Sequence, residues 1–95
     1  MEAKDRRSVW AFGMTNAEIA EKFGTDCMIC SSKPTHGRRH HVDHDHNCCA
    51  GRKTCGKCVR GILCARCNHG IGLFLNDPDL LLTAARYLKS QTIGV

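Results

Sequence analysis

Apolar residues recur at helical spacing near the start of the chain. Within residues 15–24 (TNAEIAEKFG), Thr15 and Glu18 form the capping box that is typical of a helix start, and Gly24 follows the last apolar position. The apolar side of this helix would carry Ile19, Ala20 and Phe23. The pattern therefore predicts a short amphipathic helix, preceded by an N-terminal arm (residues 1–14) for which it predicts no particular structure.

A second region of helical spacing lies near the other end of the chain. Asp77 and Pro78 have the residue types of a helix N-cap and a first helical position. The apolar positions that follow at helical spacing are Leu80, Leu81, Ala84, Ala85 and Leu88. Ahead of this predicted helix, residues 65–75 (ARCNHGIGLFL) can start another one, although Gly70 and Gly72 weaken its continuation or mark its end.

The middle of the chain contains two short stretches that are typical of strands. Residues 40–44 (HHVDH) predict a strand in which Val42 points to one side and both His41 and Asp43 point to the other. Residues 59–63 (VRGIL) predict a second strand. The connection between them, DHNCCAGRKTCGKC, contains two glycines and four cysteines. This composition indicates more structure than a plain flexible linker has.

The size of the chain indicates one small domain over residues 1–95, with a frayed tail at residues 90–95. A domain of this size usually needs a metal ion or disulfides to stabilise it. Eight cysteines are available for this purpose. No apolar signal-peptide core follows Met1, and no segment has the roughly 18 apolar residues of a membrane span, so we expect no membrane partner. We expect a cytoplasmic protein, in a bacterial host cell if a phage encodes it. Paired thiols there more often hold zinc than each other, so we expect a zinc-stabilised small α+β fold.

Positive charge is concentrated in the middle of the chain. The formal net charge is +5 with neutral histidines. The basic residues of the middle are Arg38, Arg39, Arg52, Lys53, Lys57, Arg60 and Arg66. Such a basic stripe favours a polyanionic partner, although a solvated face that aids solubility explains the charge alone about as well.

Two Cys-x-x-Cys pairs, CMIC and CARC, have the spacing of zinc knuckles. Their cysteines are Cys27, Cys30, Cys64 and Cys67. This spacing lets two pairs of thiolates converge on one tetrahedral ion, which predicts a structural zinc site. The alternative is a redox Cys-x-x-Cys, which we disfavour because a second pair is present and neither pair has a thioredoxin-like strand and helix around it.

The other four cysteines lie close together in the connection between the two predicted strands. They are Cys48, Cys49, Cys55 and Cys58. A second zinc could be held by Cys55, Cys58 and one or both of the adjacent cysteines, with His46 as fourth ligand if only one contributes. The alternatives are reduced thiols or an opportunistic metal site. We favour the zinc site because four exposed thiols in a short loop would be reactive without a partner.

Histidines and aspartates are concentrated just ahead of these cysteines. Four of the six histidines and two aspartates lie within residues 40–46. A hard ion such as Mg²⁺ keeps several waters and needs few protein oxygens. Asn68 directly follows the second zinc knuckle, so a zinc that pins Cys67 would also fix Asn68 where its oxygen could meet Asp43. Opportunistic nickel or zinc capture by the histidine tract would explain the histidines but would leave Asn68 without a purpose.

Three motifs, in order along the chain, resemble those of a known nuclease family. They are Cys-x-x-Cys at 27–30, Asp-His-Asp-His at 43–46 and Arg-Gly-x-Leu-Cys-x-x-Cys-Asn at 60–68. In this order they resemble the recombination endonuclease VII branch of the HNH, or ββα-metal, nucleases, and the resemblance runs from about Thr15 through Leu88. It implies a ββα-metal (HNH) finger, in which a β-hairpin and a helix surround one divalent ion beside a scaffold zinc, with N- and C-terminal helices flanking the finger.

The resemblance also implies roles for individual residues. Asp43 and Asn68 would hold a catalytic Mg²⁺ or Mn²⁺ ion, and His44 would be the general base. Apart from the resemblance, Asp45 could orient His44 or reach the metal through water, and His46 could touch a phosphate. The structural zinc ligands would be Cys27, Cys30, Cys64 and Cys67.

The expected activity is hydrolysis of DNA phosphodiester bonds by a one-metal mechanism, which leaves 5′-phosphate and 3′-hydroxyl ends. The DNA would be duplex or branched, and a dimer or a larger phage machine are both open. The residues expected to contact the DNA backbone are Arg38, Arg39, Arg52, Lys53, Arg60 and Arg66. The alternative is a non-catalytic zinc module that binds nucleic acid or a protein, which would need no base beside an oxygen-only metal site.

Overall fold

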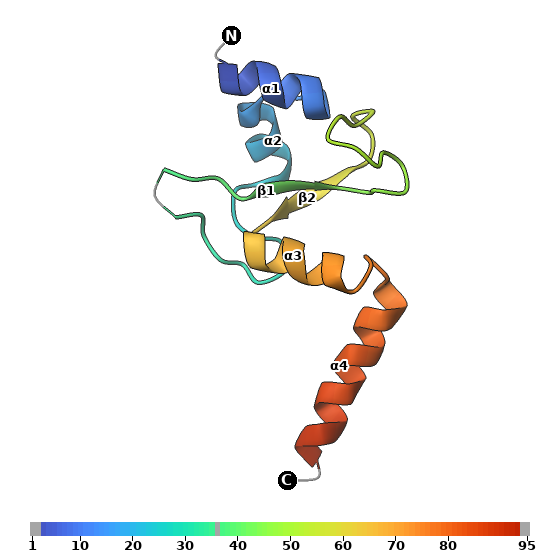
Figure 1. The fold of residues 1–95 in the computed structure, drawn as a ribbon. Helices are drawn as coiled ribbons and strands as arrows, with labels where there is room; N and C mark the ends of the chain where they lie inside the picture. Colours follow the sequence, from blue (N-terminus) through green and yellow to red (C-terminus); the bar gives the residue numbers. More distant parts are fainter. Residues whose placement is uncertain (1–2, 36, 94–95) are drawn as a thin grey trace.

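The structure, a computed structural model, describes residues 3–35 and 37–93. Along these residues the elements are α1 (Ala3–Phe12), α2 (Asn16–Phe23), β1 (His41–His44), β2 (Val59–Leu63), α3 (Ala65–Leu73) and α4 (Pro78–Ile93). The two strands form an antiparallel hairpin, and it lies between the α1–α2 pair and α3 (Figure 1). The predicted small α+β class and both predicted strands are therefore confirmed.

Helix α2 forms where the sequence predicts it. The hydroxyl of Thr15 accepts a hydrogen bond from the Glu18 backbone N–H at 3.2 Å, and the Glu18 carboxylate accepts one from the Thr15 N–H at 3.0 Å. These two bonds complete the capping box and satisfy two donors that a helix start leaves without partners. The helix ends at Gly24, whose φ of 77° is readily accessible only to glycine. Ile19, predicted on the apolar side, is buried.

The N-terminal arm contains helix α1, which the apolar pattern does not predict. Its buried side chains are Ser8 and Ala11, whereas Trp10 is exposed, so hydrophobicity does not follow burial along this helix. Polar contacts hold it in place instead. The Ser8 hydroxyl donates to the Met14 carbonyl at 2.7 Å. The Asp5 carboxylate near its start accepts from the backbone and the side chain of the first residue of α2.

The hairpin contains a bulge at its functional end. Asp43 pairs with Gly61, but His44 pairs with Val59, which leaves Arg60 without an opposite residue. A bulge of this kind bends the strand and redirects side chains. The strict alternation expected for this strand therefore does not extend to its last residue.

Helix α3 starts directly after β2 and packs against both strands. The helix continues past Gly70 and ends at Leu73, directly after Gly72, so the second glycine lies close to its end, as the sequence analysis allowed. It is followed by Leu75 and Asn76, both with positive φ, which turn the chain before α4. As predicted, Asp77 caps α4, since its carboxylate accepts hydrogen bonds from the N–H groups of the second and third helical residues at 2.9 and 3.4 Å.

Helix α4 leads away from the rest of the molecule (Figure 1). It continues to Ile93, into the tail (90–95) that we expected to be frayed, and residues 94–95 lie outside the described residues. Its predicted apolar side is largely exposed, as for Leu80 at 42% and Leu88 at 65%. The molecule is consequently elongated, with extents of 57 × 31 × 18 Å.

The apolar core is small and includes sulfur. Among the described residues, the buried apolar side chains are Ala11, Ile19, Cys27, Cys58, Ile62 and Leu63. Two of these are cysteines from the two zinc sites that the sequence predicts, so the predicted metal sites are part of the core. In the part of the chain that the structure describes, no helix combines the length and apolarity needed to cross a membrane.

Candidate metal centres and active site

The four cysteines of the two knuckles converge where the segment after α2 meets the end of β2 and the start of α3. We call Cys27, Cys30, Cys64 and Cys67 the first cysteine cluster; their Sγ atoms all lie within 4.8 Å of one another. Cys64 is also the N-cap of α3, where its Sγ accepts from the Cys67 N–H at 3.4 Å. The Met28 N–H donates to the Ile62 carbonyl at 3.0 Å, which ties the first knuckle to β2. Four converging sulfur atoms could hold zinc, as the spacing predicts.

Hydrogen bonds distribute protons unevenly over the first cysteine cluster. The Ser32 hydroxyl, 3.1 Å from Cys30 Sγ, lowers the pKa of that thiol to about 5. Burial, and then contact with the Cys64 thiol, raises the pKa of Cys67 to about 12. The thiolate of Cys30 in turn raises the pKa of Arg66 through a hydrogen bond. Arg66, predicted to contact DNA, therefore lies beside this cluster.

The remaining four cysteines also converge, within the connection between β1 and β2. We call Cys48, Cys49, Cys55 and Cys58 the second cysteine cluster, and their Sγ atoms likewise lie within 4.8 Å of one another. Both adjacent cysteines take part, and His46 is not a member of the group. This cluster could hold a second zinc ion with four sulfur ligands, without the histidine ligand that the sequence left open.

Contacts with other thiols and with backbone N–H groups shift the pKa values in the second cysteine cluster. Cys48 Sγ lies 3.6 Å from Cys55 Sγ, and this hydrogen bond raises the pKa of Cys48 to about 12. The backbone N–H of Lys57, and then the Cys48 thiol, lower the pKa of Cys55 to about 7. The Cys55 N–H donates to Cys49 Sγ at 3.2 Å. Cys55 is thus the member of this pair that loses its proton first, and thiolates are the form that binds metal.

The side chain of His44 is buried and has a fixed hydrogen-bond partner. Its Nε2 lies 2.8 Å from the backbone carbonyl oxygen of Cys49. A carbonyl oxygen can only accept, so Nε2 carries a proton in this pairing, and in the neutral ring the lone pair is then on Nδ1. The exposed ring of His46 lies against His44, with 4.3 Å between ring centroids. The contact between His44 and the Cys49 carbonyl could not be predicted from the sequence, because every residue has a carbonyl group.

A pocket of about 550 Å³ opens beside His44, on the side of α1. It is lined by Arg7, Trp10, Ala11, Phe12, Val42, His44 and Arg52. The Lys53 ammonium lies 5.7 Å from the centre of the Trp10 ring. Positive side chains from α1 and from the connection therefore meet next to His44. The sequence pattern gave Arg52 and Lys53 as candidates, but Arg7 and Trp10 could not be placed there without α1.

Asp43 is buried and is paired with the bulged residue Arg60. Arg60 Nε donates to one carboxylate oxygen at 2.7 Å and Nη2 donates to the other at 3.1 Å. The same Nη2 donates to the Asn76 side-chain oxygen at 3.1 Å. Arg60, predicted to contact the DNA backbone, thus lies against the predicted metal ligand, although 40% of its side chain is exposed.

Asn68 lies in the first turn of α3, one residue after a member of the first cysteine cluster. Its N–H donates to the Cys64 carbonyl at 2.9 Å, and its side chain is half-buried. Because α3 packs against both strands, Asn68 belongs to the element that faces the hairpin. Its role as a metal ligand, like that of Asp43, stays a prediction.

Asp45 begins the connection that follows β1. Its carboxylate accepts from the Asn47 N–H at 2.9 Å, and its carbonyl accepts from the N–H groups of Cys48 and Cys49, both at 3.1 Å. These bonds form a local turn at the start of the second cysteine cluster. They support a structural use of Asp45, beside the two roles that the sequence analysis considered.

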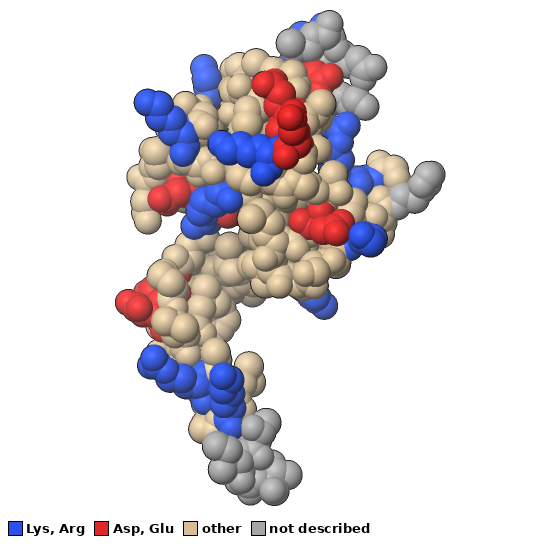
Figure 2. All heavy atoms as spheres, turned by 180° about the vertical axis from the view of Figure 1, so that it is seen from behind, with Lys and Arg blue, Asp and Glu red and all other residues tan. Residues whose placement is uncertain are grey.

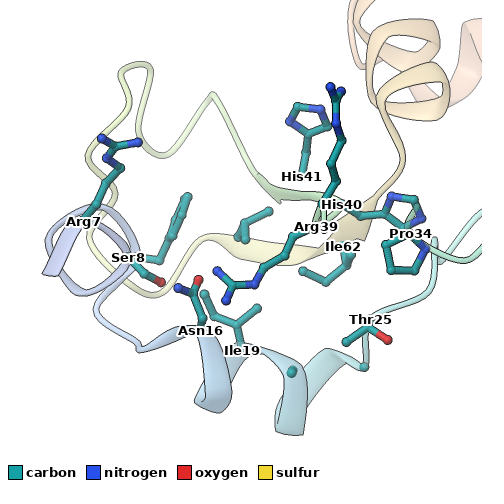
Figure 3. Close-up of a pocket in the computed structure, with 15 residues that line it drawn as sticks. Arg7, Ser8, Asn16, Ile19, Thr25, Pro34, Arg39, His40, His41 and Ile62 are labelled. Atoms are coloured by element: carbon teal, nitrogen blue, oxygen red, sulfur yellow. The ribbon is translucent and has the colours of Figure 1, made fainter. Parts of the chain in front are cut away.

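A larger pocket, of about 640 Å³, lies between α1, α2 and the hairpin (Figure 3). Its basic and imidazole side chains are Arg7, Arg38, Arg39, His40 and His41. Arg7 and His40 lie toward opposite ends of it in Figure 3. The face seen in Figure 2 carries separate groups of Lys and Arg side chains on the body and on α4, with Asp and Glu side chains among those on the body. On this face the positive charge is divided among several groups and does not form one stripe.

Comparison with known proteins gives one finding. The family model described as recombination endonuclease VII matches residues 5–90. No curated protein and no solved structure gives a match.

Proposed function

Since the chain belongs to the recombination endonuclease VII family, we propose that it is a metal-dependent DNA endonuclease in which His44 is the general base. Membership of the family indicates a nuclease, that is, a phosphodiester hydrolase that acts on DNA. To this family assignment we add three proposals: the dependence on a metal ion, the identity of the base and the residues that hold the metal. They rest on the surroundings of His44, Asp43 and Asn68.

The environment of His44 is the observation that supports the proposal best. A general base needs a free lone pair, a fixed orientation and access to its substrate. The Cys49 carbonyl fixes the ring through Nε2 and leaves Nδ1 available to take a proton. The pocket beside His44 offers access, and its side chains Arg7 and Arg52 suit a phosphate group. General base catalysis of this type contributes roughly 10²- to 10⁴-fold to the rate.

The residues present fit a divalent ion of the hard type. Asp43 and Asn68 would hold Mg²⁺ or Mn²⁺ through a carboxylate and an amide oxygen, with waters as the other ligands. A buried carboxylate needs a positive partner, and Arg60, whose side chain is partly exposed, fills that role. When bound, the ion would supply Lewis acid chemistry to the phosphate and to the leaving oxygen.

The proposed reaction balances with water as the only co-reactant. His44 Nδ1 takes a proton from a water whose oxygen attacks the phosphorus in line, and the bond from phosphorus to the 3′ oxygen breaks. The 3′ oxygen leaves and is protonated by solvent, so the ends are a 5′-phosphate and a 3′-hydroxyl. His46, exposed beside His44, is proposed to touch a phosphate.

The hairpin of β1 and β2 followed by α3 is proposed to be the ββα-metal finger of this nuclease. The first cysteine cluster lies at its base and would hold the structural zinc. The exposed residues Arg38, Arg39, Arg52, Lys53 and Arg66 are proposed to contact the DNA backbone. Contacts of this kind position duplex or branched DNA without reading its sequence.

The experiment that tests the proposal compares His44→Ala with His41→Ala, an exposed histidine on the same strand. Supercoiled, linear and branched DNA are incubated with Mg²⁺, and DNA binding is measured with Ca²⁺ in its place. We expect His44→Ala to keep its zinc and its DNA affinity but to lose cleavage by at least about 10²-fold, while His41→Ala stays within a few-fold of the parent. Cleavage by His44→Ala at the parental rate would reject the base.

The same experiment distinguishes a nuclease from a non-catalytic zinc module. A parent protein that binds DNA but cuts none of these substrates, with any of Mg²⁺, Mn²⁺ or Ca²⁺, would favour the module. Cleavage that persists after a strong chelator has stripped Mg²⁺ would instead reject the dependence on a divalent ion.

A further inference from the structure

Cys49 belongs to two sites at once. Its side chain belongs to the second cysteine cluster, and its backbone carbonyl accepts the hydrogen bond from His44 Nε2 at 2.8 Å. A change in the position of this one residue therefore alters both the sulfur cluster and the partner that orients the imidazole ring.

Apart from the turn in which the Asp45 carbonyl accepts from the Cys49 N–H at 3.1 Å, few contacts hold the segment that carries Cys49. Between β1 and β2 the chain forms no helix or strand, and its middle residues Ala50, Gly51, Arg52 and Lys53 are exposed. The ends of the segment are attached to the body, because the Asp45 N–H donates to the Cys58 carbonyl at 2.8 Å and the Thr54 N–H donates to the Ala11 carbonyl at 2.7 Å. Around Cys49 itself, the sulfur contacts of the second cysteine cluster are the main tertiary link to the far end of the segment.

We propose that the second cysteine cluster binds a zinc ion and that this ion positions His44 by holding the Cys49 carbonyl at Nε2. The inference rests on the proposed function, since it concerns the base of the proposed reaction. Zinc with four thiolates is a closed, structural type of site, so this ion takes no part in the reaction itself. Cys49 is a positioning residue, and the bound ion fixes the position of Cys49.

The two clusters have separable tasks. The first cysteine cluster joins the segment after α2 to the end of β2 and the start of α3, so it supports the fold and the helix that carries Asn68. The second lies wholly within one connection between neighbouring strands. Loss of the second ion should therefore leave the hairpin and α3 in place and should act on His44.

The metal content gives the first measurement. The parent and Ala50→Ser, which adds a serine beside Cys49 without removing a thiol, should each contain two zinc ions per chain. The double variant Cys48→Ser/Cys55→Ser should contain one. Substitution with ¹¹³Cd should give two resonances for the parent, of which the double variant loses one. A parent protein that binds only one ion would overturn the proposal.

The state of His44 gives the second measurement, and it does not depend on activity. Long-range ¹H–¹⁵N spectra report which imidazole nitrogen carries the proton. The parent and Ala50→Ser should show His44 as the Nε2–H tautomer, and the double variant should show a mixture of tautomers.

Cleavage kinetics give the third measurement. In the double variant, kcat should fall about 10- to 100-fold with little change in KM, a loss typical of partners that orient a functional side chain. Cys48→His offers a nitrogen ligand in place of sulfur and should retain the second ion, the His44 tautomer and most of kcat. If the double variant keeps both the parental tautomer and the parental kcat, the positioning role is rejected.

Failure of the inference differs from failure of the proposed function. Should His44→Ala cut DNA as fast as the parent, the base would be wrong, but the tautomer of His44 would still report whether the ion positions it. Should the tautomer of His44 be independent of the second ion, the positioning of His44 by that ion would be rejected, while His44→Ala would still test whether His44 is the base.

Discussion

Arg60 and Asp43 form a two-point ion pair across the bulge of the hairpin, with Nε 2.7 Å from one carboxylate oxygen and Nη2 3.1 Å from the other. Asp43 is 7% exposed and Arg60 is 40% exposed. The carboxylate is thus buried, whereas the guanidinium side chain is partly exposed to solvent. An arginine and a divalent ion would compete for the same buried charge, which gives a test of the metal site in the absence of DNA.

Replacement of Arg60 by alanine should destabilise the protein by about 1–3 kcal/mol, because a buried charged acceptor loses its donors. Excess Mg²⁺ or Mn²⁺ should restore much of this stability, since the cation replaces the guanidinium. Thermal unfolding with and without the ion measures both effects. Lys33→Ala, which removes an exposed ion pair with Asp26, is the control and should stay within about 0.5 kcal/mol of the parent. Equal rescue in Arg60→Ala/Asp43→Asn would show that the ion binds elsewhere.

Asn68→Ala should weaken Mn²⁺ binding and lower Mg²⁺-dependent cleavage by at least about 10²-fold, because one of two proposed protein ligands is lost. Asn68→Asp should keep both, since a carboxylate oxygen replaces the amide oxygen. Electron paramagnetic resonance of bound Mn²⁺ measures the affinity without DNA. His69→Ala, at the exposed next position of α3, is the matched control. Parental Mn²⁺ affinity in Asn68→Ala would remove Asn68 from the site.

Cys64→Ser should unfold the part of the chain around α3. This substitution removes a ligand of the first cysteine cluster and weakens the N-cap of the helix at the same time. The binding free energy of a structural zinc is comparable to the whole stability of a small domain. Circular dichroism and zinc content should both fall. Ala65→Ser, which places a serine at the neighbouring exposed position, should change neither; a folded Cys64→Ser with unchanged zinc would contradict the assignment.

Arg39→Ala should weaken DNA binding to a similar degree for unrelated sequences, because it removes a proposed phosphate contact. Each such contact contributes about 0.9 to the slope of log K against log salt concentration, so the slope should become shallower by that amount. Titrations at several salt concentrations measure it. Lys33→Ala removes the same charge outside the proposed surface and should leave the slope unchanged, so equal effects of both variants would mean that only net charge matters.

Much of the fold can be predicted from the sequence because local patterns and packing agree. The capping box of Thr15 and Glu18, the cap at Asp77 and the two strand stretches all lie where the structure has them. Helix α1 could not be predicted, because it buries Ser8 and Ala11 while Trp10 is exposed. Its attachment is polar, and hydrophobic periodicity carries no signal for that.

The candidate site, like the fold, could be predicted from the sequence only in part. Cysteine spacing predicts the first cluster, and the density of cysteines predicts the second, although only the fold shows that Cys48 and Cys49 both belong to it. The contact between His44 and the Cys49 carbonyl depends on the path of the backbone. The pairing of Arg60 with Asp43 depends on a bulge that shifts the register by one residue. Neither contact has a signature in residue types.

The small apolar core, in which two of the buried side chains are cysteines, has a thermodynamic consequence. If both clusters bind zinc in the folded state, the unfolding free energy contains a term that grows with the logarithm of the free zinc concentration. Each tenfold change in that concentration then shifts the equilibrium by about 1.4 kcal/mol for each bound ion. A melting temperature of this protein therefore describes the polypeptide and its metal buffer together, and it rises or falls with cellular zinc supply.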